Sequence, residues 1–142
     1  MERTMQFMVV VKANKDTEAG VMPATELLEA MGKFNEEMAR AGVIKAGEGL
    51  HPTSRGARIK YAGGGQATAS KGPFPLSGDL IAGFWLIETA SLEEAIGWMK
   101  RAPFLPGDEV DIRQVFTSDD FGEALTPELR EREERLRAQV GN

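Results

Sequence analysis

The stretch Lys71–Met99, KGPFPLSGDLIAGFWLIETASLEEAIGWM, decides the fold of this chain. Its central run, Leu80–Glu88, carries large apolar side chains at odd and even positions alike, which is typical of a strand covered on both faces. Ser91 followed by Glu94 has the spacing of a capping box and predicts that a helix begins there. The stretch therefore predicts a turn, a buried strand and a short helix in succession.

Upstream of this stretch, the sequence predicts a strand, a helix and a second strand. Residues Met5–Lys12 are rich in β-branched and apolar side chains on both faces, as expected for a central strand. Gly42 is placed to end a helix, and Val43–Leu50 follows it as the next strand. The apolar side chains of that helix recur at intervals of three and four residues, which predicts one amphipathic face: Leu27, Met31, Phe34 and Met38.

Two short alternating segments, Ala57–Tyr61 and Gln66–Ser70, flank the triple glycine Gly63–Gly65. Such an arrangement is typical of a β-hairpin. A phosphate-binding loop is not favoured, because the glycines lack the lysine and hydroxyl residue and the helix that should follow them.

Downstream, Val110–Phe116 predicts an edge strand, because its alternation leaves one face polar. The dipeptide Thr126-Pro127 is a typical helix start, and Glu128–Val140 predicts a charged helix with a thin apolar stripe. We interpret this helix as a solvated surface helix or a clamp for a partner.

The central stretch resembles the YCII-related, or DGPF-domain, family. The hallmarks of that family are a Gly-Pro-Phe loop, a GFxLI strand and a SLxEAxxW helix. The matching residues are Gly72, Pro73 and Phe74, then Gly83, Phe84, Leu86 and Ile87, then Ser91, Leu92, Glu94, Ala95 and Trp98. The resemblance implies a dimeric α+β barrel and no settled activity.

The order of elements predicts an α+β fold of the ferredoxin-like split βαβ type, with an inserted hairpin and a C-terminal helix. We expect a single domain over residues 1–142, with a core at about 5–117 and the C-terminal helix at about 126–140. Two helices can cover only one face of the sheet, so the other face should expose an apolar patch carrying Met8 or Phe7 and Trp85 or Phe84. We therefore expect a homodimer in which two copies pair through this open face.

The composition of the chain argues against several classes of function. The 142 residues include 22 acidic and 17 basic side chains, giving a net charge of −5, which argues against nucleic-acid binding. The absence of cysteine excludes disulfides and thiolate chemistry. The apolar run near the N-terminus is too short to span a bilayer, so we expect a cytoplasmic protein without membrane contact.

His51, the only histidine, lies beside Glu48 at the end of a predicted strand. Histidine is the residue type most often used as a general acid or base, which makes His51 a candidate for that role, although a histidine before proline can equally be a solvated loop residue. Glu48 or Asp79 could orient it, and Lys71 or Arg113 could hold an anionic substrate.

The family loop usually begins with aspartate, and here that position is Lys71, so a carboxylate has been replaced by a cation. If the family aspartate is catalytic, the activity is lost here or the carboxylate has moved to Asp79. Gly72 and Pro73 restrict the backbone, which favours a loop-shaping role, and Phe74 should pack the loop onto the sheet. We place the candidate ligand contacts at residues 71–74 and Arg113.

One histidine without cysteine gives no metal site that we can assign, and we expect no cofactor. Haem ligation by His51 stays open only by analogy with other dimeric α+β barrels.

Two functions remain open. The first is a dimeric module that binds a small molecule or a regulatory protein partner. The second is a cofactor-independent isomerase, lyase or dehydrochlorinase in which His51 is the acid-base group. Because fold does not determine function, the first is slightly preferred.

Overall fold

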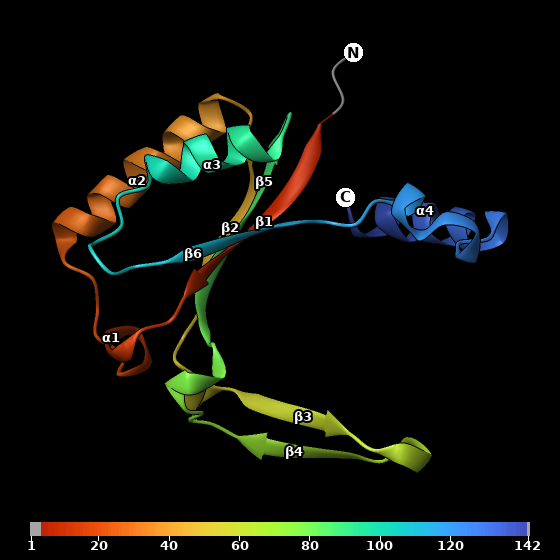
Figure 1. Ribbon diagram of the computed structural model, residues 1–142, viewed down its shortest axis with the longest axis horizontal. Helices are drawn as coiled ribbons and strands as arrows, with labels where there is room; N and C mark the ends of the chain where they lie inside the picture. Colours follow the sequence, from red (N-terminus) through yellow and green to blue (C-terminus); the bar gives the residue numbers. More distant parts are fainter. Residues whose placement is uncertain (1–3, 142) are drawn as a thin grey trace.

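The computed structural model describes residues 4–141, which form an α+β structure with a four-stranded antiparallel sheet and a separate two-stranded hairpin (Figure 1). In chain order, the elements are β1 (Met5–Lys12), α1 (Lys15–Glu18), α2 (Thr25–Arg40), β2 (Ile44–Gly49), β3 (Ala57–Tyr61), β4 (Ala67–Lys71), β5 (Ile81–Thr89), α3 (Leu92–Lys100), β6 (Val110–Gln114) and α4 (Pro127–Val140). Short 3-10 turns connect several of them.

The strand order of the larger sheet is β2-β5-β1-β6, and every neighbouring pair is antiparallel. The two strands with apolar residues on both faces, β1 and β5, lie in the middle, as the sequence predicts. β6 lies at one edge, in agreement with its polar face, and β2 at the other. Among the described residues, strands β3 and β4 pair only with each other, and they form the hairpin expected around the triple glycine.

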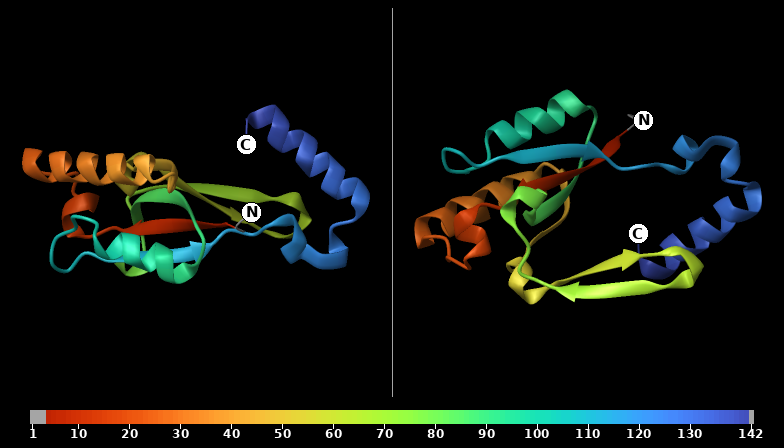
Figure 2. Two further views of the ribbon diagram at one scale, coloured as in Figure 1. Left: turned by 90° about the horizontal axis from the view of Figure 1, so that it is seen from above. Right: turned by 60° about the horizontal axis from the view of Figure 1, so that its bottom comes forward.

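Helices α2 and α3 cover one face of this sheet (Figures 1 and 2). Phe7 and Val9 of β1, with Trp85 and Ile87 of β5, point towards the helices and are buried. From the helices they meet Phe34, Met38, Ala95 and Met99. The periodicity of three and four in α2 thus identifies its buried face correctly, since that face supplies Phe34 and Met38 to the core.

We call the opposite face of the sheet the open face. The strand register shows which residues lie on it. Met8 lies opposite Leu86 and Val10 opposite Phe84 across the β1-β5 pair. Because side chains alternate along a strand, these four lie on the side away from the helices. The sequence predicted that either Met8 or Phe7, and either Trp85 or Phe84, lies on this face. The structure places Met8 and Phe84 there.

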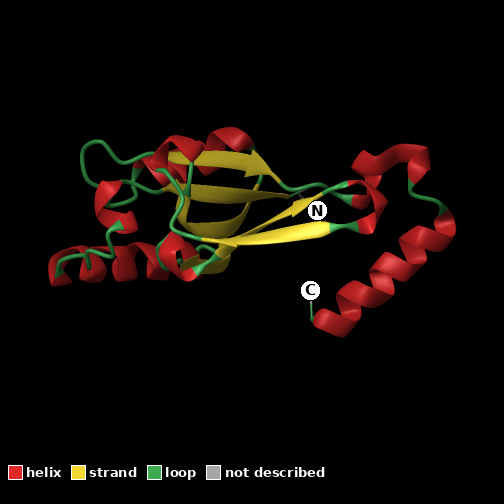
Figure 3. Ribbon diagram, turned by 90° about the horizontal axis from the view of Figure 1, so that it is seen from below, coloured by secondary structure: helices red, strands yellow, loops and turns green. Residues whose placement is uncertain are grey.

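Two arms extend from the sheet on the side opposite α2 and α3: the β3-β4 hairpin and the segment that ends in α4 (Figures 1 and 2). The view from below shows the hairpin strands and α4 at the end of the molecule away from α2 and α3 (Figure 3). Hydrophobic side chains on both arms are exposed, among them Ile59, Tyr61, Leu129, Leu136 and Val140.

Three details differ from the sequence expectations. The polar stretch from Asn14 to Met22 predicts a loop, but it contains the short helix α1. The N-cap Asn14 accepts a hydrogen bond from the Thr17 N–H and completes a capping box with Thr17. The last strand ends at Gln114 rather than Phe116, and the chain turns into a 3-10 segment at Ser118–Ala124. The sequence pattern predicts a buried stripe of Leu92, Ala95, Ile96 and Met99 in α3, but only Ala95 and Met99 reach the core, and Leu92 and Ile96 are exposed.

The start of α3 is as predicted. The Ser91 hydroxyl accepts a hydrogen bond from the Glu94 N–H at 3.1 Å, and the Glu94 carboxylate accepts one from the Ala90 N–H at 3.1 Å. The bond to Ser91 satisfies an N–H group that the first turn of the helix leaves free. The Glu94 carboxylate binds the N–H of Ala90, the residue before the N-cap, instead of the N-cap N–H that closes a capping box. This fixes the direction in which α3 leaves β5 and crosses the sheet.

Candidate functional site

The Gly-Pro-Phe loop is held against the turn that follows β2. The Gly72 N–H donates to the Gly56 carbonyl at 3.0 Å, and the Phe74 N–H donates to Thr53 Oγ1 at 2.9 Å. A Cβ atom on residue 72 would lie 1.8 Å from the Thr53 carbonyl oxygen, so the backbone there leaves space only for glycine. Gly72 therefore acts by allowing close packing of two backbone segments.

Thr53 links this loop to the short helix α1. Its N–H and its hydroxyl both lie within hydrogen-bond distance of the Glu18 carboxylate, at 3.0 Å and 2.6 Å. The same hydroxyl receives the Phe74 N–H, so one side chain connects α1, the β2-β3 connection and the loop. The helix that the sequence did not predict is thus part of the support of the loop.

A shallow hollow of about 550 Å³ lies where these segments meet the start of β5. This volume is within the range of sites for small molecules. Three of the candidate residues, His51, Phe74 and Asp79, line it, and the other lining residues are Leu50, Pro52, Thr53, Arg55, Gly56, Ala57, Arg58, Gly78, Leu80 and Ile81. The structure thus brings together candidates from the end of β2 and from both ends of the loop.

His51 is exposed, and its neighbour is a cation. Arg55 Nη1 lies 3.2 Å from Nε2 and 3.4 Å from Nδ1 of the imidazole. Within residues 4–141, neither Glu48 nor Asp79 forms a hydrogen bond with His51. Glu48 lies opposite Phe84 in the β2-β5 pair, towards the open face. The arrangement expected for an acid-base pair is therefore not formed within the single chain.

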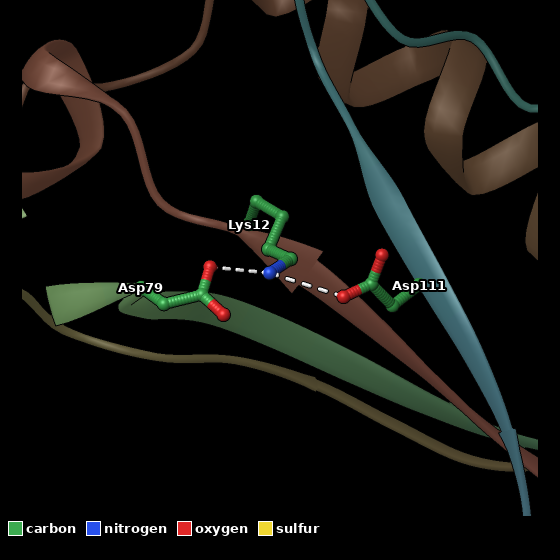
Figure 4. Close-up of polar contacts among 3 residues, drawn as sticks. All are labelled: Lys12, Asp79 and Asp111. Carbon is green, nitrogen blue, oxygen red and sulfur yellow. Dashed lines mark hydrogen bonds and ion pairs between the residues drawn. The ribbon is translucent and has the colours of Figure 1, made fainter. Parts of the chain in front are cut away.

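Asp79 instead binds Lys12, which the sequence did not suggest as a site residue (Figure 4). Lys12 Nζ donates to the Asp79 carboxylate and lies 3.0 Å from Asp111 Oδ2, so a cation from β1 is held between two carboxylates. The hydrogen bond to Asp79, and after it the one to Asp111, raises the pKa of Lys12 above its ordinary value of 10.5. This ion cluster lies beside the hollow, because Asp79 belongs to both.

Asp79 reaches Lys12 through an unusual backbone conformation. It is the only non-glycine residue with positive φ among those described, at φ 61° and ψ 55°. Asp is one of the few residue types that tolerate this left-handed region. A β-bulge between Val11 and Lys12 also shifts the register of β1 against β5 at this point.

The two basic residues that the sequence suggested as ligand contacts lie outside the hollow. Lys71 pairs with Ala57 at the base of the hairpin, and Arg113 lies opposite Met8 on the open face. Neither residue lines the hollow. The cations that do line it are Arg55 and Arg58, and the Arg58 guanidinium lies 4.0 Å from the centre of the Phe74 ring. One feature of the sequence could have pointed to these two arginines: the segment Gly49–Gly78 around them contains no Asp or Glu.

A second ion pair marks the far end of the open face. Glu88 on β5 accepts a hydrogen bond from the Thr4 hydroxyl and lies 3.4 Å from Lys45 Nζ. The hydrogen bond from Thr4 is the largest cause of the lowered pKa of Glu88; burial opposes it, and Lys45 adds to the lowering. Charged groups thus flank the apolar centre of the open face at both ends.

Within the described part of the chain, no three His, Asp or Glu side chains are grouped to hold a metal ion. Across residues 4–141 no helix is both long enough and apolar enough to cross a membrane.

Comparison with known proteins gives a match to one family model. No curated protein matches the chain significantly. The family model of the YCII-related domain matches residues 5–119, which include every strand and exclude α4. The match covers more than half of the chain, and the chain therefore belongs to the YCII-related family.

Proposed function

We propose that this YCII-related protein is a homodimeric module that binds a small molecule or acts as a regulatory accessory protein. The observation that supports binding is the hollow of about 550 Å³ beside the Gly-Pro-Phe loop. Its lining combines apolar side chains with a few polar groups, as binding sites for small molecules do. Binding is preferred to catalysis because the ring of His51 contacts Arg55 rather than a carboxylate.

The open face supports the dimer. Its centre carries Met8, Val10, Phe84 and Leu86, and Met8 is 38% exposed. Charged pairs flank this centre, Lys12 with Asp79 and Asp111 at one end and Lys45 with Glu88 at the other. An apolar centre with a polar rim is the usual composition of a protein interface.

The arms support the same assembly. An isolated two-stranded hairpin is at best marginally stable in water, yet β3 and β4 pair with no other strand and expose Ile59 and Tyr61. The hairpin and α4 both extend on the open-face side of the sheet (Figure 1). A second copy packed on the open face would lie between these arms and could cover their apolar side chains.

The strand order, with helices α2 and α3 after β1 and β5, supports assignment to the ferredoxin-like split βαβ topology. In this proposal the two sheets pack face to face and form the dimeric α+β barrel that the family resemblance implies.

Sedimentation at micromolar concentration tests the assembly. The wild type should sediment as a dimer, and Leu86→Glu should sediment as a monomer, because a carboxylate would be buried at the centre of the interface. Leu105→Glu is the matched control, since Leu105 is 58% exposed in the loop between α3 and β6, and it should remain a dimer. A monomeric wild type contradicts the proposal.

A cofactor-independent enzyme is the second candidate, and one observation favours it: His51 and Asp79 line the same hollow. In that case His51 would act as general acid or base on a bound molecule. His51→Ala would then retain the ligand and lose turnover, whereas a binding module would show no turnover in either protein.

A further inference from the structure

We propose that the hollow binds a small organic anion, a carboxylate or a phosphate monoester attached to an apolar body. This inference rests on the proposed binding function and names the class of its ligand. Three observations support it: the charge of the surrounding segment, the free guanidinium groups, and the apolar surface between them.

The first observation is the distribution of charge along the chain. The protein has a net charge of −5, yet the segment Gly49–Gly78 contains four basic residues and no acidic one. This segment supplies most of the lining of the hollow. A local excess of positive charge in an acidic protein attracts anions to that part of the surface.

The second observation is that two arginines of the lining lack a carboxylate partner. Within residues 4–141, neither Arg55 nor Arg58 forms a salt bridge. Among the described residues, Asp79 is the only carboxylate in the lining. Together with Lys12 and Asp111 it forms a cluster with one cation and two carboxylates, whose single net negative charge is outweighed by the two arginines. The net charge that the hollow presents to a ligand is therefore positive.

The positions of the two arginines favour binding at a defined point. Arg58 lies over the Phe74 ring at 4.0 Å, which restricts the orientation of its guanidinium. Arg55 lies against His51, whose ring can add a further hydrogen bond. A guanidinium matches the two oxygens of a carboxylate or phosphate with parallel hydrogen bonds.

The third observation is the apolar part of the lining, which favours an organic anion over an inorganic one. Leu50, Pro52, Phe74, Leu80 and Ile81 border the hollow. Contact with these side chains would remove apolar surface of a ligand from water. Inorganic phosphate offers no such surface, so it should bind more weakly than an anion with a hydrocarbon or aromatic body.

The test compares benzoate and phenyl phosphate with benzamide, a neutral molecule of similar shape, and with inorganic phosphate. Binding to the full chain is followed by the ring signals of His51, the sole histidine, and by calorimetry. Both organic anions should bind at least about tenfold more tightly than benzamide, as expected when one charge-assisted hydrogen bond is lost. They should also bind more tightly than inorganic phosphate.

Variants locate the site. Arg55→Gln and Arg58→Gln should each weaken benzoate binding about tenfold or more. Lys60→Gln is the matched control, because Lys60 is on the same face of β3 as Arg58 but does not line the hollow, and it should retain the affinity of the wild type. The amide spectrum of each variant verifies its fold.

Each contrary result has a distinct meaning. If benzamide binds as tightly as benzoate, the hollow is a binding site without preference for anions, so this inference fails while the proposed function stands. If Lys60→Gln weakens binding as much as Arg55→Gln, the attraction is diffuse and the inference also fails. If none of the four probes shifts the His51 signals, both the inference and the proposed binding site are overturned.

Discussion

The two faces of the four-stranded sheet are built from the same strands, yet they are covered to different degrees. Along β5, Trp85, Ile87 and Thr89 are buried beneath α2 and α3, whereas the neighbouring Phe84 and Leu86 remain partly exposed. Both faces are apolar, so the difference lies in what the single chain places over each. The helix-covered face is completed within the chain, whereas the open face keeps part of its apolar surface exposed.

The largest expected effect is the difference in stability between variants on the two faces. Ile87→Ala, on the helix-covered face, should lower the free energy of unfolding by about 2–5 kcal/mol, because Ile87 is fully buried and its removal leaves a cavity. Leu86→Ala, its neighbour on the open face, should cost only about 1 kcal/mol in dilute protein. Urea unfolding of both variants at two protein concentrations measures the difference.

The concentration series sharpens this comparison. If a second copy covers the open face, the cost of Leu86→Ala should increase with protein concentration, since association stabilises the folded state. The cost of Ile87→Ala should not change in the same way. Equal costs for the two variants in dilute protein would show that the single chain already buries both faces equally.

An intermediate effect is expected where the edge strand β2 meets the helix-covered face. Gly47 lies opposite Trp85, and a Cβ atom there would lie 2.6 Å from Trp85 Cδ1. Gly47→Ala should therefore displace the indole, which donates a hydrogen bond to Asn35 at 3.0 Å, and lower the free energy of unfolding by about 1–3 kcal/mol.

Gly49→Ala is the matched control for this substitution. Gly49 is on the same strand and the same face, but apart from its chain neighbours no atom of the described residues lies within 4 Å of a Cβ at that position. This variant should be as stable as the wild type or slightly more stable, because alanine has fewer unfolded conformations than glycine. Thermal unfolding followed by tryptophan fluorescence measures both, and equal midpoints would contradict the close approach of Gly47 to Trp85.

The positions of the main elements could be predicted because they depend on local patterns. The strand Met5–Lys12 was predicted with the limits that the structure shows, since its β-branched residues and the polar loop after it mark both ends. The start of α3 followed from Ser91 and Glu94. The short helix α1 was missed because four residues cannot display a helical period, although Asn14 and Thr17 form a capping box.

The choice between the two faces could not be predicted from the strands alone. Phe7 and Met8 are similar in hydrophobicity, and only the packing of α2 and α3 decides which of them becomes buried. The sequence could therefore identify an open apolar face but not its members.

The candidate site was predictable in part for a similar reason. His51, Phe74 and Asp79 lie in segments that border the predicted loop, and all three line one hollow. The contact between Lys12 and Asp79 depends on a β-bulge after Val11 and on a left-handed backbone at residue 79. Neither feature has a reliable local signal, and the two residues are far apart in sequence.

The smallest expected effect concerns this ion cluster at the edge of the open face. The pKa of Lys12 is raised in the folded state, chiefly by Asp79. The ion cluster therefore contributes its full stabilisation below pH 10.5, the ordinary pKa of lysine. This stabilisation is lost as the pH rises through the higher pKa that Lys12 has in the folded protein. Lys12→Met should reduce stability near neutral pH, and its difference from the wild type should shrink in alkaline solution.

The acid partner provides the control for this last comparison. Asp79→Asn removes the largest cause of the raised pKa while Asp111 remains. In that background, Lys12→Met should have a smaller effect, and the alkaline change should be weaker. Urea unfolding from pH 8 to 11 measures all four proteins of this cycle. A difference between wild type and Lys12→Met that stays constant over the whole range would show that the ion cluster does not hold the lysine in its charged form.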